Sequence, residues 1–422
     1  MLITSYLAVF VGGVLLALVL TPAVRRLAVR LGAIDQPGER KIHAQPVPRL
    51  GGVAVLIAVS FAVAGAFWLI PEMRPAITST LGAARWGVLA SAVLLICAMG
   101  AIDDFGGLPA RLKFLIEITA AAAVVLVAGA PEAIDFSPFS FSLRLGYVAP
   151  LLAIFFIIAL TNAVNMTDGV DGVAGGISAI AALTLGTMSV AAGHVVAPVV
   201  LFALAGALVG FLPHNFRTPK VFLGDTGSLG VGFVLGAAVL IGLQRDGAWL
   251  IVPAVLALAV PLTELGLTVL RRTLRALTVE RTTLPRERFV FQAGWPGLFV
   301  PDRRHIPHRL LELGLSKRWA IAALYAIGAT LGGLGLAAFY EPELGPFIGL
   351  TIVAVVIYFA PRWLYHELRL IERGALLPIL ESRLLRSRAL QATYDGAVVF
   401  VSCLATEAIV MGPAAVLSGG SA

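Results

Sequence analysis

The sequence predicts an all-α membrane protein that crosses the bilayer many times. Of its 422 residues, 59% are apolar and 13% are charged, and the mean hydropathy is +0.94. Soluble proteins carry about 25% charged residues, and a compact soluble fold could not hide this much apolar surface. Long apolar runs follow one another along the chain. Lipid is therefore the expected solvent, and the disordered, disulfide-stapled and nucleic-acid-binding classes are excluded.

Eleven windows have the length and apolar composition of a spanning helix, which needs ~17–25 residues. They cover residues 3–24, 53–70, 87–102, 114–129, 148–163, 173–192, 195–212, 227–243, 249–270, 319–339 and 345–361. A weaker twelfth window is 396–416. Residues 134–143 alternate apolar and polar side chains, which predicts a short hairpin outside the bilayer. No internal repeat is visible, so we expect one membrane domain over residues 1–361 and a basic cytoplasmic tail over 362–422.

The basic residues orient these helices. Nearly all of the 31 lysines and arginines fall in odd-numbered loops, counted from the first span. The positive-inside rule places those loops in the cytoplasm and the N-terminus outside. The pI near 9.8 is therefore explained by topology, without a nucleic-acid partner. The first apolar run has no basic segment before it and no cleavage site after it, so we expect a retained span rather than a signal peptide.

Four polar clusters stand at the edges of the apolar runs, all in odd-numbered loops or beside them. Polar groups are costly in a membrane, so such clusters indicate function. The first is Asp103–Asp104, followed by Arg111 and Lys113. Adjacent carboxylates repel, so the pair requires a cation or a shared proton unless it is a solvated helix cap. The two basic residues fit an anionic substrate and interfacial anchoring equally well.

The second cluster places a polar side chain at every third residue, at Asn162, Asn165, Asp168 and Asp171. If the stretch is helical, each side chain is rotated by ~60° from the last, so the four form one drifting stripe. Amide and carboxylate oxygens are the ligands that Mg²⁺ prefers. The alternative is a connecting turn rich in Asn and Asp, although such turns rarely keep a spacing of three.

The third cluster, residues 221–230, reads Val-Phe-Leu-Gly-Asp-Thr-Gly-Ser-Leu-Gly and leads into the eighth span. Asp225 precedes a helix whose free amides and dipole attract phosphate, and a carboxylate beside an anion site needs a metal between them. The stretch lacks the Gly-Lys-Ser/Thr ending of a Walker A loop. A simple N-cap is the alternative.

The fourth cluster, residues 302–309, reads Asp-Arg-Arg-His-Ile-Pro-His-Arg inside a long basic loop. Histidines among arginines make a poor metal site and a good phosphate cradle, unless the loop serves only as a topology signal. Two further ionisable residues, Glu117 and Glu264, lie within predicted spans. We expect a structural role for Glu117 and a functional one for Glu264, which lies close to the cytoplasmic end of its span.

In this order the clusters resemble the polyprenyl-phosphate N-acetylhexosamine-1-phosphate transferases, which form glycosyltransferase family 4. The resemblance runs from about Asp35 to Ser316. Residues 35–52, which read Asp-Gln-Pro-Gly-Glu-Arg-Lys-Ile-His-Ala-Gln-Pro-Val-Pro-Arg-Leu-Gly-Gly, look like the first cytoplasmic loop of that family. Five motifs in register on one predicted face carry the resemblance.

The resemblance implies transfer of a sugar 1-phosphate, GlcNAc-1-phosphate or another N-acetylhexosamine-1-phosphate, from a UDP-amino-sugar to undecaprenyl phosphate. UMP would be released, and the step would initiate cell-surface polysaccharide synthesis in the bacterial cytoplasmic (inner) membrane. The cofactor implied is Mg²⁺, with Mn²⁺ as a substitute, and family habit implies a homodimer. A polyprenyl phosphate is largely dianionic at neutral pH, since its second pKa is ~6. We therefore expect direct attack by the lipid phosphate.

The resemblance also assigns roles to single residues. The metal ligands would be Asp225 and Asn165. The catalytic residues would be Asp103, Asp104, His305 and His308. The substrate-binding residues would be Lys41, His43, Arg111, Lys113, Asn162, Asp168, Asp171, Phe222, Arg303 and Arg304. Asp168 and Asp171 would contact the nucleotide end, and Phe222 would stack on the uracil.

Two positions depart from the family pattern. Pro307 replaces the middle histidine of the usual His-Ile-His-His, and Glu264 stands where an aspartate is common. Three other functions are alternatives to the transferase interpretation. A phospho-MurNAc-pentapeptide translocase of peptidoglycan synthesis favours Pro-x-His-His-His, and an anionic-solute transporter would place polar residues near the midplane in related halves. Pro307 alone raises the third, an inactive membrane scaffold.

Overall fold

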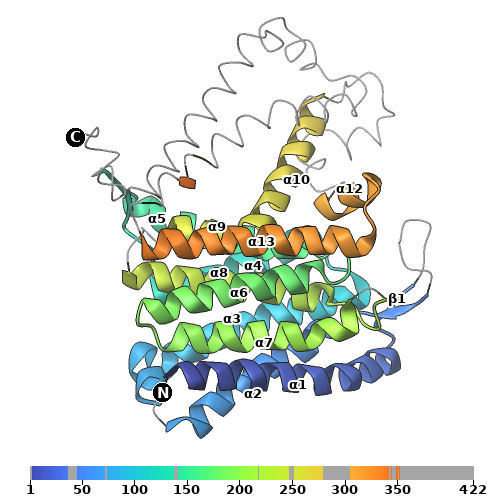
Figure 1. The fold of residues 1–422 in the computed structure, drawn as a ribbon, viewed down its shortest axis with the longest axis horizontal. Coiled ribbons are helices and arrows are strands. Elements are labelled where there is room, and N and C mark those ends of the chain that lie inside the picture. Colours follow the sequence, from blue (N-terminus) through green and yellow to red (C-terminus); the bar gives the residue numbers. More distant parts are fainter. Residues whose placement is uncertain are drawn as a thin grey trace, which may run out of the picture. The chain divides into compact units, whose positions relative to one another are not determined.

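A computed structural model confirms an all-α membrane protein (Figure 1). It describes residues 2–36, 45–71, 74–136, 141–216, 218–246, 251–278 and 305–341, together with residues 344, 348, 349 and 351. Within these residues, eight helices are long and apolar enough to cross a membrane, and a bent helix pair makes a ninth span if it is counted as one. The predicted windows 345–361 and 396–416 fall largely or wholly outside the described residues.

Most predicted spans correspond to single helices. The eight are α1 (Leu2–Leu31), α2 (Gly51–Leu69), α3 (Arg74–Gly106), α5 (Ala149–Thr167), α6 (Val173–Ala191), α7 (Val196–Asn215), α8 (Gly224–Asp246) and α13 (Lys317–Tyr340). The predicted fourth span is α4 (Ala110–Ala128), which is long enough but has three charged residues, Arg111, Lys113 and Glu117, near its start. The short helix α12 (Ile306–Glu312) precedes α13.

The predicted span 249–270 is not one straight helix, which corrects the sequence-based expectation. It consists of α9 (Ile251–Ala257) and α10 (Ala259–Thr278), which are bent by 80°. Pro261 has no N–H to donate to the carbonyl of Ala257, and its ring crowds that carbonyl, so the helix breaks at Leu258. The backbone ladder resumes when Leu262 donates to the carbonyl of Leu258 over 3.1 Å.

Within the residues that the structure describes, two small sheets form in the segments that connect helices. Strands β1 (Ile34–Asp35) and β2 (Val47–Pro48) pair antiparallel, with Asp35 opposite Val47. Strands β3 (Ala133–Phe136) and β4 (Phe141–Arg144) form the second sheet. This pair confirms the hairpin that the sequence predicts over residues 134–143.

Small residues let the helices approach closely. Helix α1 lies along α7, and α7 lies along α6 (Figure 1). A Cβ on Gly206 or Gly210 of α7 would overlap the carbonyl oxygens of Phe10 and Val14 of α1. Helix α8 packs against α2, α3 and α5. Because three helices fix its position, the start of α8 is a rigid place for a functional carboxylate.

The chain divides into two compact units. The first comprises residues 1–135, 142–265 and 304–336 and contains all of the site described below. The second comprises residues 136–141, 266–303 and 337–422, and within it Arg271 donates a hydrogen bond to the hydroxyl of Thr268 over 3.1 Å. The predicted boundary between residues 361 and 362 lies outside the described residues and stays a prediction.

Candidate active site

The start of α2 and the segment before α8 are joined backbone to backbone. The amide of Gly51 donates to the carbonyl of Phe222 over 2.9 Å, and the amide of Gly52 donates to the carbonyl of Leu223 over 2.7 Å. A Cβ on Gly52 would overlap the backbone of Gly227 in α8. These two motifs, far apart in sequence, therefore form one rigid frame beneath the site.

Asp104 of α3 caps the first turn of α8. Its Oδ1 accepts a hydrogen bond from the amide of Asp225 over 2.9 Å. Its Oδ2 accepts from the amide of Thr226 over 3.0 Å and from the hydroxyl of Thr226 over 2.7 Å. Helix N-termini leave amides without intrahelical partners, and a carboxylate there also meets the positive end of the helix dipole. Asp104 therefore holds Asp225 in place, and a further catalytic role for Asp104 stays a prediction.

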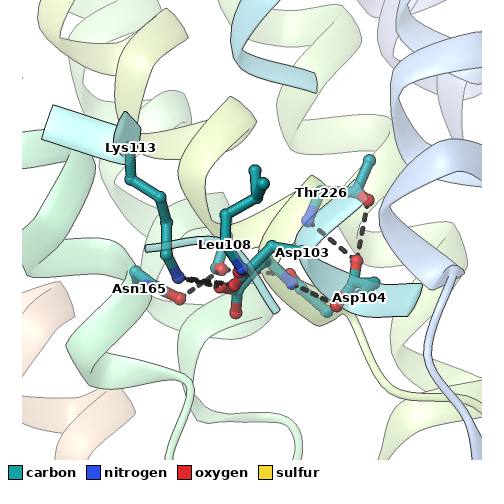
Figure 2. A network of polar contacts seen from close by, with 9 residues as sticks. Asp103, Asp104, Leu108, Lys113, Asn165 and Thr226 are labelled. Carbon is teal, nitrogen blue, oxygen red and sulfur yellow. Dashed lines mark hydrogen bonds and ion pairs between the residues drawn. The ribbon is translucent and has the colours of Figure 1, made fainter. Parts of the chain in front are cut away.

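Lys113 bridges carboxylates of two helices. Its Nζ lies 2.5 Å from Oδ2 of Asp103 (Figure 2) and 3.4 Å from Oδ2 of Asp225. The amide of Leu108 also donates to Oδ1 of Asp103. The sequence predicts that the acidic pair needs a cation, and Lys113 supplies one to Asp103.

The polar side chains near the end of α5 contact two neighbouring helices, α8 and α4. Asn165 accepts a hydrogen bond from the hydroxyl of Ser228 in α8 over 2.7 Å. One turn earlier, the amide group of Asn162 donates to Oε2 of Glu117 in α4 over 2.6 Å. Glu117 is buried and has an amide partner here, while the structural role expected from the sequence stays a prediction. Asn162 does not line the pocket described below, and its assignment to substrate binding stays a prediction.

The helix ends at Thr167, so Asp168 and Asp171 lie in a turn rather than on the predicted stripe. The turn closes at Gly172, whose φ of 84° favours glycine. Two side chains hold this residue. Oδ1 of Asn215 accepts from its amide over 2.7 Å, and the hydroxyl of Tyr325 donates to its carbonyl over 2.6 Å.

The acidic turn also holds a lysine that sequence reasoning missed. Nζ of Lys317, the first residue of α13, lies 2.6 Å from Oδ2 of Asp171. Asn215 and Tyr325 were missed as well. Their only sequence signal is a polar side chain at the end of, or inside, an apolar run, and nothing in the sequence pairs them with Gly172.

These elements enclose a pocket of about 330 Å³. Its lining includes Phe222, His308, five carboxylates and two cations. The carboxylates are Asp35, Asp104, Asp168, Asp171 and Asp225, and the cations are Arg49 and Lys317. Arg49 forms an ion pair with Asp35. The structure thus brings the predicted clusters together in one place.

The two histidines of the late motif lie in different surroundings. His308 lines the pocket beside the acidic turn, whereas Nδ1 of His305 lies 2.6 Å from Oε1 of Glu264. Oε2 of Glu264 accepts a hydrogen bond from the amide of Ile306 over 2.9 Å. Pro307 is buried in the first turn of α12, where a missing N–H costs nothing. The departure from the family motif is therefore compatible with a folded helix start.

Comparison with known proteins identifies the family. The model of glycosyl transferase family 4 matches residues 86–243, from within α3 to within α8. A probable undecaprenyl-phosphate N-acetylglucosaminyl 1-phosphate transferase of Bacillus subtilis is 30% identical over 354 residues, which are 83% of this chain and 88% of the relative. The chain belongs to glycosyltransferase family 4.

Further family 4 relatives carry related names. A decaprenyl-phosphate N-acetylglucosaminephosphotransferase of Mycolicibacterium smegmatis is 34% identical over 361 residues, which are 79% of this chain and 82% of the relative. An undecaprenyl-phosphate alpha-N-acetylglucosaminyl 1-phosphate transferase of Yersinia pestis is 27% identical over 353 residues, which are 79% of this chain and 85% of the relative.

Some residues that the family 4 resemblance assigns cannot be placed in the pocket. Lys41, His43, Arg303 and Arg304 lie outside the described residues. Arg111 is exposed on α4 and does not line the pocket. The functions of these residues stay predictions.

Like charges crowd the acidic side of this family 4 site. Burial raises the pKa of Asp168 well above its usual value, and the negative charges of Asp171, Asp225 and Asp104 raise it further. Such crowding favours a bound cation. Within the described residues, no group of three or more His, Cys, Asp or Glu side chains is arranged to hold a metal ion. Mg²⁺ commonly takes one or two protein carboxylates and completes its coordination with substrate phosphates and water, so a small protein ligand set fits it.

Proposed function

We propose that this membrane protein transfers a sugar 1-phosphate from a UDP-amino-sugar to a polyprenyl phosphate and releases UMP. The pocket carries this proposal, because its carboxylates and cations lie at the ends of membrane helices. A water-soluble donor and a lipid acceptor can meet only at such a place. The named relatives act on undecaprenyl or decaprenyl phosphate and N-acetylglucosamine, so we propose GlcNAc-1-phosphate as the transferred group and the bacterial cytoplasmic membrane as the location.

The reaction needs charge neutralisation more than a general base. The acceptor phosphate has a second pKa of ~6, so at neutral pH it is already a nucleophile. One of its oxygens forms a bond to the phosphorus that bears the sugar. The bond from that phosphorus to the bridging oxygen breaks, and the electron pair leaves with UMP. What resists the step is the approach of a dianion to a diphosphate, and fixed positive groups offset this repulsion.

The chain supplies these groups from separate elements. Arg49 lies beside the cap formed by Asp104, and Lys113 lies between Asp103 and Asp225. Phe222 lines the same pocket and offers an aromatic face for the uracil. His308, on the first turn of α12, offers a hydrogen-bond donor over the acidic turn. By binding and orienting the two substrates, these fixed side chains lower the activation barrier of the transfer.

The donor set of the pocket also fits Mg²⁺. Asp225 is 30% exposed on its side chain, and Oδ1 of Asn165 has a second lone pair beyond the one used by Ser228. These two residues would hold the ion, with Mn²⁺ as a substitute. When bound, Mg²⁺ neutralises charge on the diphosphate.

A specific observation argues against each of the competing functions. An inactive scaffold rests on Pro307, which the first turn of α12 accommodates. A transporter requires polar groups near the membrane midplane, whereas the pocket lies at helix ends. The names of the relatives specify N-acetylglucosamine, which ranks the peptidoglycan translocase second.

A donor panel tests the proposal. Purified protein in detergent receives undecaprenyl phosphate and Mg²⁺, and UDP-GlcNAc, UDP-GalNAc and UDP-MurNAc-pentapeptide are offered separately while UMP and lipid product are measured. We expect UMP and a lipid-linked sugar from UDP-GlcNAc, and loss of both with a chelator or with Asp225→Asn. Turnover of UDP-MurNAc-pentapeptide alone would establish the translocase instead. No turnover of any donor by a protein that still binds UMP would overturn the transferase proposal.

A further inference from the structure

Lys317 lies at the wall of the pocket, and the proposed transfer assigns it no role. It begins α13, and its ammonium pairs with Asp171 over 2.6 Å. The two side chains are 27% and 20% exposed, and both line the pocket. An ion pair that remains partly exposed to solvent contributes little to stability, so stability alone is a weak reason for this lysine.

Packing along α13 fixes where this lysine lies. The hydroxyl of Tyr325 donates to the carbonyl of Gly172, and the tyrosine ring lies so close to Gly176 that a Cβ there would overlap it. Further along, a Cβ on Gly332 would meet the hydroxyl of Thr184 at 2.7 Å. These contacts pack α13 along α6, from Gly176 in its first turn to Thr184 further along. Lys317 is therefore held at the pocket by its helix, and the ion pair with Asp171 only directs the ammonium.

The distribution of charge in the pocket indicates a ligand-binding role for this lysine. The described lining contains five carboxylates but only two full cations, Arg49 and Lys317. Arg49 pairs with Asp35, which belongs to strand β1. Lys317 pairs with the turn that contains Asp168 and Asp171. An anionic ligand that binds against this turn meets the carboxyl groups of Asp168 and Asp171, and Lys317 is the lining cation bonded to the turn itself.

We propose that Lys317 binds the uridine diphosphate end of the donor. Asp171 then acts as a positioning residue that holds the ammonium toward the ligand. An ammonium has three N–H donors and a full charge, so a carboxylate contact still permits a hydrogen bond to a phosphate oxygen. This inference rests on the proposed function, because it names a donor-binding residue of the same pocket.

Nucleotide binding by the full chain in detergent tests the inference. UMP serves as the probe in calorimetry, and KM and kcat are measured with UDP-GlcNAc. A charge-assisted hydrogen bond contributes ~1.5–3 kcal/mol, so we expect Lys317→Gln to weaken UMP binding and to raise the donor KM by about 10- to 100-fold. We expect kcat to change by less than about threefold, because uniform binding affects KM alone. Lys317→Arg should restore most of the affinity.

Arg318 offers a matched control. It is the next residue of α13, carries the same charge, and is exposed outside the pocket. Arg318→Gln should therefore leave both UMP affinity and KM unchanged. A purely structural Lys317 would give the opposite pattern, in which Lys317→Gln lowers the unfolding temperature and leaves UMP affinity at the wild-type value. That result would overturn the inference.

The two proposals fail in different ways. If wild-type protein turns over UDP-GlcNAc but Lys317→Gln binds UMP normally, the role of Lys317 is wrong and the transferase function stands. If no donor is turned over while Lys317→Gln still weakens UMP binding, the transfer reaction is wrong and the nucleotide contact of Lys317 stands.

Discussion

At the residue scale, the carboxyl group of Asp168 lowers the stability of the folded protein once it ionises in the pocket. Burial and three neighbouring carboxylates raise its pKa, so the folded protein releases this proton at a higher pH than the unfolded chain does. The unfolded carboxyl ionises near pH 4. Stability is therefore lost as the pH rises from about 4 through the folded pKa.

Asp168→Asn removes this cost. We expect the variant to unfold at a higher temperature than the wild type in detergent without metal or substrate, with a larger difference at pH 8 than at pH 5. We also expect it to lose transferase activity. An equal or lower unfolding temperature for the variant at pH 8 would show that Asp168 carries no such penalty.

Lys113 makes a second prediction at this scale. Its ammonium is shared by Asp103 and Asp225, so Lys113→Gln leaves two carboxylates without their common cation. We expect turnover to fall by about 100-fold, which is typical for removal of one fixed electrostatic group. Lys220→Gln, an exposed lysine outside the pocket, is the control and should retain wild-type turnover. Unchanged turnover in Lys113→Gln would contradict the assignment.

The sequence predicts the residue types of the site better than their contacts. Residues such as Asp103, Asp225 and His308 stand out because polar groups beside apolar runs are costly and rarely accidental. The partners Lys317, Asn215 and Tyr325 come from other helices, and only tertiary packing brings them to the acidic turn. A single sequence carries no signal for such long-range pairs.

At the element scale, the N-terminus of α2 depends on glycine. The amide of Gly52 bonds to Leu223, and a Cβ on Gly52 would overlap the backbone of Gly227. We expect Gly52→Ala to lower stability by about 1–3 kcal/mol or to prevent folding, since the crowded atoms are backbone. Thermal unfolding in detergent is the measurement.

Gly65, further along α2, is the matched control. A Cβ at Gly65 has no neighbour within 4 Å. Because alanine favours a helix more than glycine does, Gly65→Ala should be neutral or stabilising by up to ~1 kcal/mol. If Gly65→Ala and Gly52→Ala destabilised the protein equally, close approach would not be the reason for Gly52.

Helix boundaries are predictable where the sequence changes from apolar to polar. They are less predictable where a proline or a glycine sets the backbone conformation. The apolar windows located most helices within a few residues. The bend between α9 and α10 was missed, although Pro261 was its visible signal. The spacing of three predicts one helical stripe from Asn162 to Asp171. This prediction is wrong beyond Thr167, because α5 ends there and Gly172 turns the chain.

At the scale of the whole molecule, the proposed transfer requires the pocket to face the cytoplasm, where a UDP-sugar is available. The distribution of lysine and arginine predicts this orientation. In a variant with Cys97 and Cys403 replaced by alanine, a cysteine at Lys220 should react with an impermeant maleimide only after the cells are opened. A cysteine at Arg144, in the predicted fourth loop, should react in intact spheroplasts. The reverse labelling pattern would contradict the orientation.

The central claim is that the lipid phosphate attacks the UDP-sugar directly within this pocket. Its most direct test is UMP release from UDP-GlcNAc by purified protein with Mg²⁺, measured with and without polyprenyl phosphate. Direct attack predicts UMP only when the acceptor is present, in equal amount to the lipid-linked sugar. A stoichiometric burst of UMP without acceptor, or no UMP with acceptor, would contradict the claim.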